Sequence, residues 1–167
     1  MKLICIDTQL LIWGIQGRAM EGQLDMIQRT KGFFSDCEEQ KTIIMVPFVV
    51  VGEFLTGFPE NEHALIIKSL HDSFIISPYD LQASLIFASL FSKKTKSREI
   101  NQIKIDHQST RAELKADSMI VATAIAKKAE ILYSHDQALK KFAQNHIQVS
   151  EIPRYTDQIG LPLLDKN

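Results

Sequence analysis

Short apolar runs alternate along this chain with longer stretches whose apolar residues recur at helical spacing. The short runs predict strands at residues 2–6, 42–46, 73–76, 131–134 and 147–149. Helical spacing predicts helices at residues 10–13, 23–37, 62–70, 81–92 and 137–145, and one more that starts at Pro47 and stops before Gly57. The clearest helix follows Thr110 and Glu113, which form a T-x-x-E capping box.

Alternating strands and helices of these lengths predict an α/β fold with a central parallel sheet, because parallel strands need long crossover connections. We expect a single domain over residues 1–150 and a C-terminal tail over residues 151–167.

The composition is that of an ordinary globular protein, with 45% hydrophobic and 23% charged residues in 167. The longest apolar stretches, residues 43–51 and 120–126, are too short for a membrane span, so we expect no membrane partner. Asp7 interrupts the first apolar run, which argues against a signal peptide. Two cysteines suggest no disulfide framework, and we expect a cytoplasmic protein.

Positive charge gathers in one segment although the net charge is only −1. Residues 92–115 hold seven basic side chains against three acidic ones. A basic segment can attract polyanions, and a solvated, partly mobile arm is an equally good interpretation. The candidate phosphate contacts are Lys93, Lys94, Lys96, Arg98 and Lys115.

Four acidic residues lie at or soon after the predicted strands: Asp7, Glu53, Asp117 and Asp136. The carboxyl ends of parallel strands meet at one rim, where such sheets bind ligands. Carboxylates that met there would repel one another unless a cation lay between them, and Mg²⁺ prefers oxygen ligands. The pattern therefore points to metal-dependent phosphate chemistry.

The last two acids can be placed by chain length. Twelve helical steps from Asp117 to Ala129 cover roughly 18 Å, and six extended steps from Glu130 to Asp136 cover roughly 20 Å. The extended segment runs back over nearly the same length as the helix, so Asp117 and Asp136 should lie at the same end of the molecule.

Each acid also has a structural interpretation. Taken singly, Asp7 and Asp136 are typical of helix N-caps and Glu53 of an exposed helical residue. Asp117 lies in a strongly apolar helix, where an unpaired carboxylate is costly to bury. Four acids at equivalent positions are harder to explain as caps.

These motifs resemble the PIN-domain nucleases, and among them the VapC-like toxin ribonucleases. The resemblance runs over residues 1–149 and depends on ICIDT around Asp7, VGEFL around Glu53, KADSMIVATA around Asp117 and SHD ending at Asp136. The stretch from Asp117 to Asp136 is its most specific part. Gln9 departs from the family, which usually has Asn or Ser there, and the basic insertion at about residues 92–109 is longer than the compact toxins need.

The resemblance implies a Rossmann-like three-layer α/β/α sandwich with about five parallel strands. It implies one or two Mg²⁺ or Mn²⁺ ions held by Asp7, Glu53, Asp117 and Asp136, with Ser134 hydrogen-bonding a metal-bound water or a phosphate. It also implies an RNA substrate, a cognate antitoxin and a homodimer.

The first functional hypothesis is therefore a metal-dependent endoribonuclease that hydrolyses RNA phosphodiester bonds, in which a metal-activated water attacks phosphorus in line. A catalytically degenerate PIN-like module that binds RNA or protein is the alternative. A phosphotransferase with Asp7 as nucleophile is a third hypothesis, which Gln9 disfavours because such enzymes have an aspartate there. No G-x-G-x-x-G motif follows the first strand and no P-loop motif occurs.

Overall fold

The computed structural model describes residues 2–154. Its centre is one sheet of five strands in the order β3-β2-β1-β4-β5, and every neighbouring pair is parallel. The strands are β1 (Leu3–Ile6), β2 (Ile43–Pro47), β3 (Ile75–Ser77), β4 (Ile131–Tyr133) and β5 (Gln148–Ser150). All five lie within two residues of their predicted positions.

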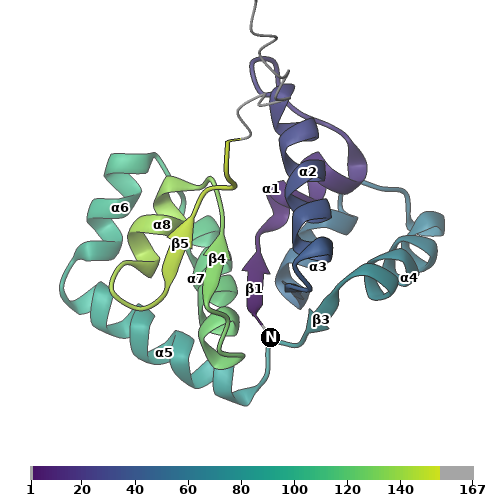
Figure 1. Cartoon of the computed structure of the whole chain (residues 1–167). Coiled ribbons are helices and arrows are strands. Elements are labelled where there is room, and N and C mark those ends of the chain that lie inside the picture. The colour runs from purple at the N-terminus through teal and green to yellow at the C-terminus, as the bar shows by residue number, and fades with distance from the viewer. Residues whose placement is uncertain (1, 155–167) are drawn as a thin grey trace, which may run out of the picture.

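Helices cover both faces of the sheet (Figure 1). One side carries α1 (Thr8–Leu11), a π-helical turn (Ile12–Gln16), α2 (Asp25–Glu39), α3 (Phe48–Leu55), a 3₁₀ turn (Glu60–Glu62) and α4 (His63–Ser73). The other side carries α5 (Leu81–Lys96), α6 (Glu99–His107), α7 (Arg111–Ala126) and α8 (Gln137–Ala143). The predicted three-layer α/β/α sandwich is confirmed.

The central strand explains why the sheet needs both layers. Ile4, Cys5 and Ile6 of β1 are all fully buried, so each face of this strand is covered by helices. Leu132 of β4 and Val46 of β2 are buried as well. A near-continuous apolar strand is typical of a parallel sheet covered on both faces.

Local signals set most helix boundaries. The capping box forms as predicted: the Thr110 hydroxyl accepts from the Glu113 amide, and the Glu113 carboxylate accepts from the Thr110 amide. Pro47 differs slightly from its expected place in the first helical turn. It ends β2 and precedes α3 with an extended backbone, at φ −63° and ψ 148°.

The basic segment is helical and packed. Helix α5 continues to Lys96, the chain turns through Arg98 in the left-handed region at φ 64°, and α6 follows. Ile100 and Ile103 of α6 are buried in the core. The interpretation as a solvated, mobile arm is therefore wrong for residues 99–107, because two apolar anchors attach them to the domain.

The first residues of the predicted tail are also bound. The Arg29 guanidinium donates to the carbonyl oxygens of Ile152 and Pro153, the latter at 2.7 Å. The remainder of the tail, residues 155–167, lies outside the described residues. Among the helices described, none is long and apolar enough to cross a membrane.

Candidate acidic site at the strand ends

Asp7 follows β1 directly and caps α1. Its Oδ1 accepts a hydrogen bond from the Gln9 amide at 3.0 Å, and its Oδ2 accepts from the Ser134 hydroxyl. The side chain is 4% exposed. Burial raises the pKa of Asp7 to about 7, although the hydrogen bonds from Ser134, Gln9 and Leu10 act in the opposite direction. The Gln9 side chain leaves its Oε1 buried without a hydrogen-bond donor among the described residues.

Asp136 follows β4 and caps α8. Its Oδ1 accepts from the Leu139 amide at 2.8 Å, while its own amide donates to the Ser134 hydroxyl at 3.0 Å. Buried Ser134 therefore connects Asp7, which follows β1, to Asp136, which follows β4. The resemblance suggested that this hydroxyl binds a metal water or a phosphate, whereas the structure uses it to hold Asp7 in place.

Asp117 lies on the second turn of α7, partly buried. Burial raises its pKa to about 8, and the charges of Asp136, Glu53 and Asp7 add to that rise, in this order. All four predicted acids are thus close enough to interact. The chain-length argument that Asp117 and Asp136 share one end of the molecule is consistent with this coupling.

Glu53 reaches the site from α3 and is exposed to solvent. Its Oε2 accepts a hydrogen bond from the Thr8 hydroxyl, which comes from α1. The sequence-based reasoning did not single out Thr8. Thr8 directly follows Asp7, the cap of α1. This position could have identified Thr8 from the sequence, because a hydroxyl there lies at the same rim of the sheet.

The arrangement of the acids tests whether a metal fits. As the side chains stand, no three His, Cys, Asp or Glu residues in the described part of the chain form a group that could hold a metal ion. The carboxylates of Asp7 and Glu53 are instead occupied by hydroxyl donors. The donor chemistry nevertheless fits a hard cation, since all four candidates offer carboxylate oxygens.

The electrostatics favour the same conclusion. No Lys or Arg is among the causes that shift the pKa of Asp7 or of Asp117. Raised carboxyl pKa values mean that ionising these groups without a counter-charge is unfavourable. A divalent cation would supply that charge.

The predicted phosphate contacts separate into two groups. Lys115 is exposed and lies two residues before Asp117 on α7. Lys93, Lys96 and Arg98 are exposed at the corner between α5 and α6.

Lys94 is not available for an RNA phosphate. It is 8% exposed, forms a 2.7 Å ion pair with Glu99 and lies over the ring of Phe142. Its charge and that of Lys93 contribute, after burial, to lowering the pKa of His146, which follows the far end of α8. Lys94 therefore lies beside the C-terminal part of α8, whereas Asp136 caps the start of that helix.

His135 has a structural role beside the site. The ring packs edge-on against Trp13 with 5.1 Å between centroids, and its Nε2 accepts from the Ile152 amide at 3.3 Å. His135 thereby attaches the end of the described chain next to Asp136.

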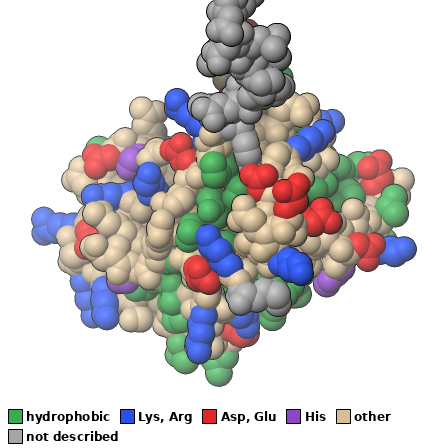
Figure 2. Space-filling view, viewed as in Figure 1, with side chains coloured by type: hydrophobic (Ala, Val, Ile, Leu, Met, Phe, Trp, Pro, Cys, Tyr) green, Lys and Arg blue, Asp and Glu red, His purple; other side chains and the backbone are tan. Residues whose placement is uncertain are grey.

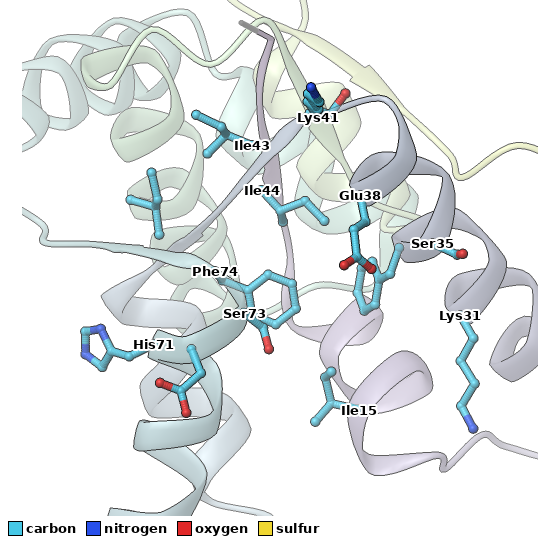
Figure 3. Close-up of a pocket in the computed structure, with 14 residues that line it drawn as sticks. Ile15, Lys31, Ser35, Glu38, Lys41, Ile43, Ile44, His71, Ser73 and Phe74 are labelled. Carbon is cyan, nitrogen blue, oxygen red and sulfur yellow. The ribbon is translucent and has the colours of Figure 1, made fainter.

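A large cavity, of about 860 Å³, lies away from these acids (Figure 3). Its wall includes Ile43 and Ile44 at the start of β2 and Ile75 at the start of β3, whereas Asp7 and Asp136 follow the ends of β1 and β4. Lys31 and Glu38 of α2 carry opposite charges along its edge. None of the four acids lines it, so cavity size alone does not identify the acidic site.

Comparison with known proteins gives matches in structure only. No protein-family model and no curated protein sequence matches this chain. A chain of VapBC2 from Rickettsia felis, bound to a DNA fragment from their promoter, matches with a TM-score of 0.63 at 10% identity, over 89% of this chain and 98% of that one.

Two further solved structures are similar. A chain of VapBC-1 from nontypeable Haemophilus influenzae has a TM-score of 0.60 at 13% identity, over 89% of this chain and 97% of that one. A chain of DNA-bound VapBC from Salmonella typhimurium has a TM-score of 0.62 at 12% identity, over 92% of this chain and 100% of that one. At these identities the matches establish a shared fold, and the predicted PIN-like fold is confirmed.

Proposed function

We propose that this chain is a metal-dependent endoribonuclease that hydrolyses RNA phosphodiester bonds. One observation carries the proposal: Asp7, Glu53 and Asp136 lie close enough to Asp117 at one rim to oppose its ionisation. Such mutual repulsion is costly for stability, and acidic sites that retain it are typical of cation binding.

The residues divide into ligands and supports. Asp7, Asp117 and Asp136 would hold Mg²⁺ or Mn²⁺ directly, and Glu53 would do so through water. When bound, the cation would lower the pKa of a coordinated water and offset the charge of the scissile phosphate. Ser134 would keep the Asp7 carboxylate oriented.

Thr8 would support Glu53 in the same way, since its hydroxyl already donates to that carboxylate. Lys115 would position a phosphate near Asp117, because a phosphate contact fixes the strand without reading its sequence. Lys93, Lys96 and Arg98 stay predictions as further phosphate contacts.

The test is cleavage of single-stranded RNA by the pure protein with Mg²⁺ and with Mn²⁺, compared with chelator. Asp117→Asn should reduce the rate on the order of a hundredfold or more. Glu130→Gln is the matched control, because this exposed carboxylate precedes β4 at the opposite end of the strand. Full metal-dependent cleavage by Asp117→Asn would overturn the assignment of the site.

A second function is a binding module with a degenerate site. The observation that favours it is the absence of a ready three-ligand group among the described residues, together with the hydroxyl partners of Asp7 and Glu53. Calorimetric titration with Mn²⁺ separates the two functions: a protein that binds no metal cannot be the nuclease, while metal binding with cleavage excludes the module.

The similarity to chains of VapBC complexes supports a protein partner of the antitoxin type. We propose that partner, and toxin activity in the cytoplasm, as part of the same function. We also propose a homodimer formed through an apolar groove of about 300 Å³ between α3 and α4, lined by residues that include Phe48, Leu55 and Ile67.

A further inference from the structure

A second groove begins next to the acidic site. It has a volume of about 490 Å³ and lies between helix α8, strand β5 and the end of α6. Its lining contains three basic side chains and three glutamines, and no acidic residue: His107, Gln137, Lys140, Lys141, Gln144 and Gln148, with apolar Ile147 and Val149. The sequence-based candidates included none of these residues.

The groove follows one stripe of α8. Gln137, Lys140, Lys141 and Gln144 are spaced i, i+3, i+4 and i+7, so they lie on one face of the helix. The opposite face, which includes Leu139 and Phe142, is fully buried. The polar stripe is therefore the solvent face of a helix whose orientation is fixed by the core, and it covers about 10 Å along the axis.

The stripe starts at the acidic rim. Gln137 directly follows Asp136, the cap of α8. Lys140 lies one turn further along the same stripe. The groove thus leads away from the site where the proposed chemistry occurs.

The cations along this path are free to meet a ligand. Neither Lys140 nor Lys141 forms an ion pair with any described residue, in contrast to Lys94, which is bound to Glu99. Both lysines are exposed on the surface of α8, and both line the groove. Figure 2 shows Lys or Arg side chains close to a His side chain on the surface over α6 and α8. At the start of the stripe, the Gln137 side chain donates to Glu151 at 3.5 Å.

We propose that this α8–β5 groove holds the single-stranded RNA that leaves the acidic site, with Lys140, Lys141 and His107 contacting its phosphates. The inference rests on the proposed nuclease function. Glutamine amides both donate and accept, so Gln144 and Gln148 suit base edges and the 2′-hydroxyl. No Phe, Tyr or Trp is among the described residues that line the groove, so stacking on such rings does not contribute and binding should be largely independent of sequence.

The test is binding of a fluorescent single-stranded RNA, followed by anisotropy over a series of salt concentrations. All proteins carry Asp117→Asn, so that the RNA stays intact. Lys140→Gln with Lys141→Gln should weaken binding at least about tenfold and reduce the slope of log K against log salt by about 1.4, because each phosphate contact on a single strand contributes about 0.7.

The matched control is Lys68→Gln with Lys128→Gln. It removes the same charge from exposed lysines that do not line the groove, so it should change the slope little. Equal losses in the two double variants would overturn the proposal, because they would show attraction by net charge alone. The same variants are also tested for binding of an acidic peptide. If Lys140→Gln with Lys141→Gln retained RNA binding but lost binding of this peptide, the groove would bind a protein ligand and the proposal would be wrong.

Cleavage assays separate this inference from the nuclease function. If Lys140→Gln with Lys141→Gln loses RNA binding while the otherwise unchanged protein cleaves no RNA, the groove is right and the nuclease is wrong. If that double variant keeps its full cleavage rate and KM in the otherwise unchanged protein, the nuclease is right and the groove is wrong.

Discussion

Single carboxylates at the acidic rim oppose the folding of the metal-free protein. The pKa of Asp7 rises from 3.8 to about 7 and that of Asp117 from 3.8 to about 8. Since a tenfold change in an ionisation constant corresponds to about 1.4 kcal/mol, the effect at neutral pH is of the order of a few kcal/mol. The residues proposed to bind a cation are therefore expected to reduce the stability of the metal-free protein.

A pH dependence of stability follows. Between the unfolded pKa of 3.8 and folded values of about 7 and 8, the folded protein binds more protons than the unfolded chain. Stability should therefore fall as the pH rises through this window. Thermal unfolding with chelator, measured from pH 5 to pH 8 at constant ionic strength, should show a falling Tm.

Two comparisons make this measurement specific. Asp117→Asn should raise the Tm at pH 8 and flatten the profile, and saturating Mg²⁺ should flatten the profile of the unchanged protein. A Tm that rose with pH in the metal-free protein would contradict the assignment of these groups.

Thr8 is predicted to act through Glu53. Removing its hydroxyl in Thr8→Val leaves the exposed Glu53 carboxylate free to rotate, because this hydroxyl is its donor. We expect cleavage at limiting Mg²⁺ to fall about tenfold, the effect of roughly 1.4 kcal/mol. Excess Mg²⁺ should restore most of the rate, whereas a loss that metal does not restore would assign Thr8 a role in the chemical step.

At the scale of elements, two of the four acids proposed to bind a metal are also helix caps. Asp7 and Asp136 accept amide hydrogen bonds at the starts of α1 and α8, so both structural interpretations made from sequence are right. The same two residues also face Asp117 closely enough to raise its pKa. A carboxylate that caps a helix at a strand end is already fixed at the rim, and the two uses are compatible.

Helix α6 is predicted to contribute to the core and not only to charge. Ile103→Ala should cost about 2–5 kcal/mol of unfolding free energy, since Ile103 is 2% exposed. Ile105 lies on the same helix and is 72% exposed, so Ile105→Ala should stay within about 0.5 kcal/mol. Urea unfolding measures both, and equal effects would mean that α6 does not pack as described.

Sequence patterns predicted the strands and the capping box because each depends on neighbouring residues. The use of Lys94 could not be predicted in this way, since its burial depends on Phe142, which is distant in the chain, as well as on nearby Glu99. The α8 stripe was readable as a helical pattern. The groove itself could not be predicted from this pattern, because it forms only where β5 and α6 are placed beside the exposed face of α8.

At the scale of the whole molecule, the domain presents different surfaces on its two sides. The α8–β5 groove is basic, whereas the groove between α3 and α4 is mainly apolar. Phe48 is 52% exposed and Ile67 38% exposed along the latter. Strand β3 lies beside it at the edge of the sheet, and exposed edges favour association. An RNA strand and a second protein could therefore bind together without competing.

A charge placed in the apolar groove between α3 and α4 tests the proposed homodimer. Ile67→Glu places a charge in the apolar groove and should convert a homodimer into a monomer, because an unpaired charge is costly to bury at an interface. Leu65→Glu is the control: Leu65 lies on the same helix, does not line the groove and is 72% exposed. Light scattering after size exclusion measures the mass of each variant. If only Leu65→Glu dissociated the dimer, the interface would lie on the other side of α4. If both variants were monomers and cleaved RNA at the rate of the unchanged protein, the acidic site would be complete within one chain.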